Sequence, residues 1–197
     1  MKKKYSKRYK KLLEENKTKN SLKIDEAIVK VKKNCTTKFD ESIDVSLFLN
    51  LKQKKEEFNL RTMVNLPNGN GKKVRVAVLC EDNKVEEAKK SGAELSGSDT
   101  IIEDITAGKI KFDKLIATPA MMSKMGKLGK ILGPKGLMPN PKLGTVTNNI
   151  GAAVKSLKSG QVEIKNDKDG NVGISIGKKN FPDNKISENF KSLIQSL

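Results

Sequence analysis

The chain has 197 residues, and the 36% of them that are hydrophobic suffice for one large core or two small ones. Its formal net charge is +17, with 40 basic and 23 acidic residues, no histidine and two cysteines. This composition favours a polyanionic partner, nucleic acid before an anionic membrane, and it leaves a zinc site without its usual ligands.

The first 20 residues are strongly basic and predict a solvated or RNA-embedded arm. They lack the apolar core of a secretory signal, so we expect no targeting peptide. No apolar run in the chain approaches the ~20 residues that span a bilayer, so we expect no membrane partner.

A helix is predicted where Ile24, Ala27, Ile28 and Val31 recur at helical spacing. The alternation from Ile43 to Leu49 predicts a strand whose polar side chains point away from the core. A second strand over residues 61–66 should end at Pro67 and the turn residues 68–71.

The middle of the chain predicts a βαβ pattern. A buried strand over residues 73–79 precedes a helix over 85–91 that stops at Gly92. A helix over 100–107, capped by Asp99, then leads to a strand over 114–118. We therefore expect a small parallel sheet with helices on its faces.

Residues 128–144 contain four glycines and three prolines but no acidic residue. Glycine and proline fix a specific backbone path, and we expect neither helix nor strand there. The apolar residues of this segment must be buried: Leu128, Ile131, Leu132, Leu137, Met138 and Leu143.

The C-terminal part predicts a helix over 148–158, a hairpin of strands 161–165 and 172–176, and a helix over 183–197. The fold class is therefore α/β and α+β: a discontinuous split α+β domain (1–66 and 158–197) with an inserted Rossmann-like α/β/α domain (67–157). Two connections near Leu66, Pro67 and Lys158 would form a double hinge.

Two short segments have the chemistry to contact RNA. One opens the first strand, and the other is the hairpin tip, where cations, amides and backbone groups can meet phosphates, riboses and bases. From the pattern alone, Phe39 could stack on RNA or pack in the core. The candidate residues are Lys38, Phe39, Glu41, Ser42, Lys165, Asn166, Asp167, Lys168 and Gly170.

Enzyme motifs are absent. Residues 68–72 superficially suggest a phosphate loop, but Leu66 stands where the first Walker glycine belongs and Lys73 where serine or threonine should follow. No dinucleotide fingerprint follows the strand ending at Leu79. We expect no catalytic residue, no metal and no cofactor.

Several segments resemble the large-subunit ribosomal protein L-one family, in its order. They are SKRYKKLLEENK, KIDEAI, KFDESIDV, LPNGNGKKVRVAV, FDKLIATP, LGKILGPKGLMPNPKLGTVT and VEIKNDKDG. The resemblance implies the same split fold and an RNA-binding face at positions matching Lys38, Phe39, Glu41, Lys165, Asp167 and Lys168. Lys165 replaces a typical arginine, which weakens any bidentate contact. The family normally adds a closing strand after the helix at 183–197, and this sequence ends without it, so weaker autonomous binding is expected.

The interpretation is a structural protein of the large ribosomal subunit that binds ribosomal RNA at the mobile stalk and assists the exit of deacylated tRNA. The resemblance also implies repression of its own mRNA. The partners would be large-subunit ribosomal RNA, exit-site tRNA, its own mRNA and other ribosomal components, on a ribosome in an organelle (mitochondrion or plastid) or in the bacterial cytoplasm. The alternatives are a non-ribosomal RNA chaperone and a nucleotide-dependent enzyme that uses the inserted domain.

Overall fold

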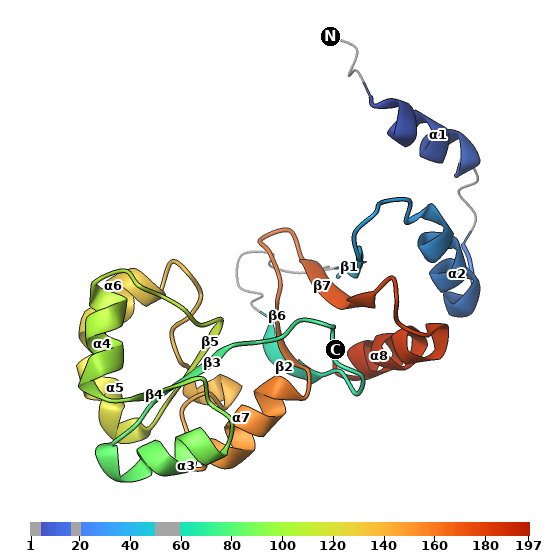
Figure 1. Ribbon diagram of the computed structural model, residues 1–197. Coiled ribbons are helices and arrows are strands. Elements are labelled where there is room, and N and C mark those ends of the chain that lie inside the picture. Colours follow the sequence, from blue (N-terminus) through green and yellow to red (C-terminus); the bar gives the residue numbers. More distant parts are fainter. Residues whose placement is uncertain (1–4, 17–20, 50–59) are drawn as a thin grey trace.

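The computed structural model describes residues 5–16, 21–49 and 60–197 (Figure 1). The two ends of the chain contribute α1 (Lys7–Glu15), α2 (Ile24–Asn34), β1 (Ser42–Phe48), β2 (Arg61–Asn65), β6 (Gln161–Lys165), β7 (Asn171–Lys178) and α8 (Asp183–Gln195). The middle contributes β3 (Val76–Leu79), α3 (Val85–Lys90), β4 (Leu95–Gly97), α4 (Asp99–Thr106), β5 (Lys114–Ala117), α5 (Met122–Met125), α6 (Gly129–Leu132) and α7 (Ile150–Lys158). The predicted fold class, an α+β part made from both ends and an α/β part between them, is confirmed.

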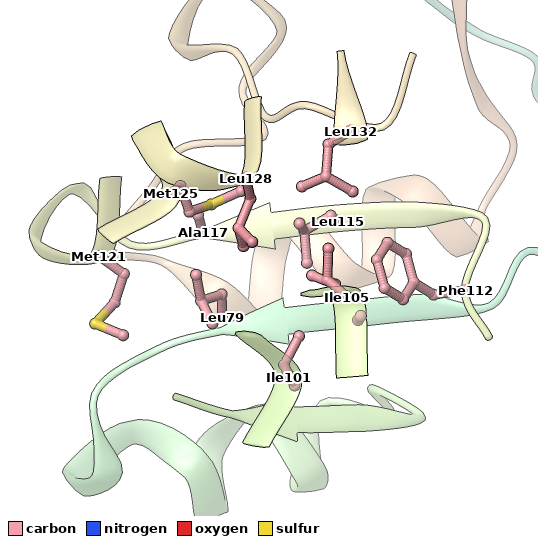
Figure 2. Close-up of a cluster of buried hydrophobic side chains, with 11 residues drawn as sticks. Leu79, Ile101, Ile105, Phe112, Leu115, Ala117, Met121, Met125, Leu128 and Leu132 are labelled. Carbon is pink, nitrogen blue, oxygen red and sulfur yellow. The ribbon is translucent and has the colours of Figure 1, made fainter. Parts of the chain in front are cut away.

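The middle part is built on a parallel sheet with strand order β4–β3–β5. Alternate residues of β3 enter two different cores: Ala77 and Leu79 face α4 and the segment after β5, whereas Val76 and Val78 face α3 and α7. Figure 2 shows the first core, where Ile101 and Ile105 of α4 meet the strands. Helices on both faces of a parallel sheet give the expected Rossmann-like layering.

The glycine- and proline-rich segment covers one face of this sheet. Leu128 and Leu132 are buried against Leu115 and Ala117 in the first core (Figure 2), and Ile131, Leu137 and Met138 pack around them. The burial prediction is therefore confirmed. The prediction of no helix is wrong, because Gly129–Leu132 form one turn of helix, α6, and Pro141–Leu143 form a 3₁₀ turn.

The end parts share a third core. β1 pairs with β7 and β2 pairs with β6, each as an antiparallel ribbon. Ile43 of β1, Ile174 of β7 and Ile164 of β6 pack with Ile28 of α2 and Ile186 of α8. Segments from the beginning and the end of the chain therefore bury their apolar faces together.

Three local predictions need correction. The strand predicted from residue 73 begins only at Val76, because the N–H of Arg75 donates to the Asp113 carboxylate (3.0 Å) outside the ladder. The three-residue strand β4 was missed, since it is too short to show alternation. Ser98, not Asp99, occupies the N-cap of α4, and Asp99 instead pairs with Lys124 (3.0 Å).

The predicted hairpin is only partly right. A tight turn does connect β6 and β7, with the N–H of Gly170 donating to the Asp167 carbonyl (3.2 Å). The two strands share only the isolated bridge between Asn166 and Val172, however, and each then pairs with a different strand from the first third of the chain. The turn thus links two ribbons instead of closing one.

Candidate nucleic-acid interface

The β1–β7 ribbon has one buried face and one open face. Ile43, Val45 and Leu47 point into the core, which places the alternate residues of β1 on the opposite side. We call this opposite side the outer face; it consists of Asp44, Ser46 and Phe48 of β1 and Gly173 and Ser175 of β7. A groove lies on this face, lined by residues of both strands and by Lys72.

The segment before β1 lies at one end of the outer face. Lys38 and Ser42 are exposed, and the Phe39 side chain is 69% exposed, so this ring does not pack in the core. The Oγ of Ser42 accepts a hydrogen bond from Lys178 Nζ (2.7 Å). This end therefore presents cations, a hydroxyl and an open aromatic ring.

Glu41 links this segment to α1. Its carboxylate lies 3.9 Å from the guanidinium of Arg8 on α1. Burial alone would raise the pKa of Glu41, but the neighbouring polar side chains of Thr37 and Cys35 and the charge of Arg8 outweigh burial and lower that pKa. Glu41 is thus a charged anchor between α1 and β1.

The hairpin tip lies at the other end of the outer face. The Asp167 carboxylate accepts hydrogen bonds from the backbone N–H groups of Asp169 (3.0 Å) and Asn171 (2.7 Å) and from the Asn171 side chain (2.9 Å). These bonds, the Asn171 side chain first, lower the pKa of Asp167. Asp167 therefore shapes the turn, while Lys165 and Lys168 stay exposed.

Asn166 and Gly170 also shape the tip. Asn166 is buried; its Oδ1 accepts from the N–H of Leu60 (2.6 Å) and its amide donates to the Asp167 carbonyl (2.8 Å). Gly170 has φ of +83°, and its carbonyl accepts from the N–H of Leu49 (2.9 Å). The tip is thereby fixed to the end of β1.

The structure does not gather the nine candidate residues into one cluster. Ser42 pairs with Lys178, whereas Phe48 pairs with Asn171 at the opposite end of the ribbon. These pairs are six residue steps apart along β1, or about 20 Å. An RNA that contacts both groups must therefore lie along the outer face.

Two side chains on this surface were missed by sequence reasoning. Phe48 is 71% exposed. In the alternating pattern of β1 it falls on the polar side, and this position is the signal that could have identified it. Arg61 lies directly opposite Lys165 on the β2–β6 ribbon, which depends on a pairing that the sequence did not predict. Like charges opposite each other destabilise a ribbon unless a counter-charge is near, and here Glu163 binds Arg61 (2.7 Å).

The predicted hinge residues differ in their surroundings. Leu66 is fully buried, and its N–H donates to the Gly160 carbonyl (3.2 Å), so the two connections touch. Pro67 is exposed. Lys158 is the last residue of α7, and its Nζ donates to the Gly92 carbonyl (2.6 Å) of the middle part. The connection after it is therefore Ser159 and Gly160.

Other kinds of site find little support in the described residues. Cys80 is buried, which raises the pKa of its thiol, and Cys35 is half-buried; both are free. No group of three or more metal-ligating side chains occurs within residues 5–16, 21–49 and 60–197. In that same part of the chain, no helix has the length and apolar content to cross a membrane.

Comparison with known proteins places the chain in a family. The model of the ribosomal protein L1p/L10e family matches residues 31–197. The large ribosomal subunit protein uL1 of Pelagibacter ubique is 59% identical over 192 residues, which cover 98% of this chain and 84% of that protein. The uL1c protein of Phaeodactylum tricornutum is 48% identical over 194 residues, with the same coverage. The uL1 protein of Fervidobacterium nodosum is 44% identical over 195 residues, covering 98% of this chain and 83% of that protein. The chain therefore belongs to the ribosomal protein L1p/L10e family.

Proposed function

We propose that this chain is a structural constituent of the large ribosomal subunit that binds ribosomal RNA at the mobile stalk. Its relatives carry the name large ribosomal subunit protein, and they come from bacteria and, as the uL1c form, from Phaeodactylum. The site of action would be a ribosome in the bacterial cytoplasm or in an organelle. Binding, not chemistry, would be the mechanism.

The observation that carries the RNA-binding proposal is the open outer face of the β1–β7 ribbon. Two exposed aromatic rings flank its length, Phe48 on the face at one end and Phe39 in the segment before β1 at the other, and both can stack on bases or sugars. Lys38 lies beside one ring and Lys168 is on the tip beside the other, and both are exposed for phosphates. Shape and phosphate contact would therefore select a folded RNA.

Two finer functions extend this proposal. In the middle part, the glycine-rich segment and the helical turns before it carry lysines that are exposed: Lys124, Lys127, Lys130, Lys135 and Lys142. A second basic surface suits a further RNA, and we propose exit-site tRNA as that partner. The protein would also repress its own mRNA where that messenger presents the same fold as the ribosomal site.

The test is binding of a stalk-type ribosomal RNA fragment across a salt series, beside a shuffled RNA of equal length. We expect tight, shape-selective binding that survives moderate salt. Phe48→Ala should weaken binding by roughly tenfold, because stacking on one base is worth about 1–3 kcal/mol. The control is Ile194→Ala, which removes an exposed apolar side chain from α8, outside the outer face and the N-terminal arm.

Three outcomes discriminate between the readings. Equal affinity for the shuffled RNA, with a steep salt slope, would contradict specific recognition and favour the RNA chaperone. Saturable binding of a nucleotide by the middle part, without RNA binding, would favour the nucleotide-dependent enzyme. Selective binding that Phe48→Ala weakens and Ile194→Ala leaves unchanged would support the ribosomal interpretation.

A further inference from the structure

A polar cavity of about 520 Å³ lies where the two connections pass each other. We call it the hinge cavity. Four lysines line it: Lys72 and Lys73 of the first connection, Lys158 at the end of α7 and Lys185 of α8. Among the residues that the structure describes, no carboxylate lines it. Concave walls of one charge sign concentrate the field, so the cavity is suited to an anion.

Three of the four ammonium groups are free to bind one. Among the described residues, none forms a hydrogen bond or ion pair with the ammonium group of Lys72, Lys73 or Lys185. Lys158 is different, because it donates to the Gly92 carbonyl and lies 3.7 Å from Glu94. A second acidic group near the wall is Glu188, which accepts a hydrogen bond from the Asn68 amide (2.7 Å).

Two glycines shape the backbone of the cavity wall. Gly69 and Gly71 have φ of +65° and +76°, and a Cβ on Gly71 would lie 2.7 Å from Lys178 Cγ and 3.3 Å from the Phe181 ring. The first connection therefore passes close to the side chains beside it. Because the first connection turns tightly, the cavity wall is lined by its main chain and by side-chain amides. Their N–H groups can donate hydrogen bonds to an oxyanion.

The cavity and the outer face share one side chain. Lys72 lines the hinge cavity and also the groove on the outer face. Next to it, Lys178 packs at Gly71 and donates to Ser42 at the end of that groove. A chain of phosphates lying on the outer face would therefore pass one carboxylate, Asp44, and reach the cavity at Lys72.

We propose that the hinge cavity binds a phosphate group, supplied by the backbone of the RNA that lies on the outer face. The proposal rests on the proposed RNA-binding function for the source of the phosphate. Lys72, Lys73 and Lys185 would neutralise it by charge, as lysines do without a bidentate fork. Because the cavity joins both connections to α8, a bound phosphate would also restrain the middle part relative to the end parts.

The test compares two triple variants with equal loss of charge. Lys72→Gln, Lys73→Gln and Lys185→Gln remove the cavity lysines, and Lys89→Gln, Lys90→Gln and Lys109→Gln remove exposed lysines of the middle part. We expect the cavity variant to lose roughly tenfold or more in affinity for the stalk-type RNA and to lower the salt slope by about 1 per lost phosphate contact. The control should change much less, and circular dichroism checks that both are folded. Equal losses in the two variants would overturn the proposal.

A second arm uses inorganic pyrophosphate and does not need the RNA. We expect pyrophosphate to shift the NMR amide signals of Gly69, Gly71 and Gly160 in the wild type and not in the cavity variant. If the wild type binds no stalk RNA, the proposed function fails while these shifts still test the cavity. If pyrophosphate shifts these signals but the cavity variant binds RNA as tightly as the wild type, the RNA is not the source of the phosphate. The ligand of the cavity would then be a free phosphate. No shift and no RNA effect would overturn the site.

Discussion

Asn189 of α8 is a buried polar side chain that joins three segments. It is fully buried, its amide donates to the carbonyls of Gly69 and Ile176 (both 2.8 Å), and its Oδ1 accepts from the N–H of Asn68 (3.0 Å). All its hydrogen-bonding groups except one lone pair are thereby used. It ties the first connection to β7 and α8.

Asn189→Ala should therefore lower the free energy of unfolding by about 2–4 kcal/mol, because it leaves buried backbone groups without partners. The measurement is urea unfolding followed by far-ultraviolet circular dichroism, since the chain has no tryptophan. Asn184→Ala, at an exposed position of the same helix, is the matched control and should cost far less. A midpoint for Asn189→Ala equal to that of the wild type would contradict this account.

Asp167 makes the hairpin tip sensitive to pH. Because hydrogen bonds from Asn171, Asp169 and Gly170 lower its pKa below the ordinary 3.8, the charged carboxylate stabilises the folded tip. That contribution is present above pH 3.8 and is lost as the pH falls through the lower pKa of the folded state. In an NMR titration, the Asn171 side-chain amide should shift with a midpoint below 3.8.

Asp167→Asn should reproduce the acid state at neutral pH. Hydrogen exchange at the amides of Asp169 and Asn171 should become faster, whereas Asp169→Asn, at an exposed neighbour whose carboxylate holds no backbone group, should leave the turn intact. Unchanged exchange in Asp167→Asn would mean that the turn does not depend on the charge.

At the scale of elements, the two connections are held in contact through glycine. Gly160 has φ of +109°, and a Cβ there would lie 2.6 Å from Gly69 Cα and 2.8 Å from the Leu66 carbonyl oxygen. Both neighbours are backbone, so neither can rotate away. Gly160→Ala should combine backbone strain with a clash, at a total of about 2–4 kcal/mol.

Gly108→Ala separates the cost of backbone strain from the cost of the clash. Gly108 also has positive φ (+75°), but nothing lies within 4 Å of a Cβ added there. We expect thermal unfolding by circular dichroism to show a larger drop in Tm for Gly160→Ala than for Gly108→Ala. Equal drops would mean that the connections separate at little cost.

The elements also show what the sequence could and could not predict. Periodicity placed α2, β1, α7 and α8 because each has a face set by a single core. Strand pairing was harder to predict. The turn at Asp167 suggested that β6 pairs with β7, whereas β6 pairs with β2 and β7 pairs with β1, both of which are far away in the sequence. The same long-range pairing decides the site: it puts Lys38 and Lys168 at opposite ends of a ribbon and brings Arg61 beside Lys165.

At the scale of the whole molecule, the end parts and the middle part have separate cores with few links between them. Met63 of β2 packs against the core that holds Val76 and Val78. On the same face of the β2–β6 ribbon, Glu163 lies 3.4 Å from Lys114 of β5. The two side chains are 29% and 18% exposed, and one ion pair that keeps contact with solvent is worth about 1 kcal/mol, so the coupling that it adds between the parts is weak.

Weak coupling predicts that the two parts lose stability separately. Leu132→Ala truncates a fully buried side chain in the middle part, and Leu193→Ala does so in the end parts; each should cost its own part about 2–5 kcal/mol. Hydrogen exchange resolved by residue measures this, because amides report on the unit that opens. Leu132→Ala should reduce protection in β3 and β5 and leave β1 and β7 near their wild-type values, with the reverse for Leu193→Ala. RNA binding at 25 °C should then survive Leu132→Ala and weaken in Leu193→Ala. Equal loss of protection in all four strands would mean that the division at residues 66 and 158 marks no boundary of stability, and that the cores unfold as one.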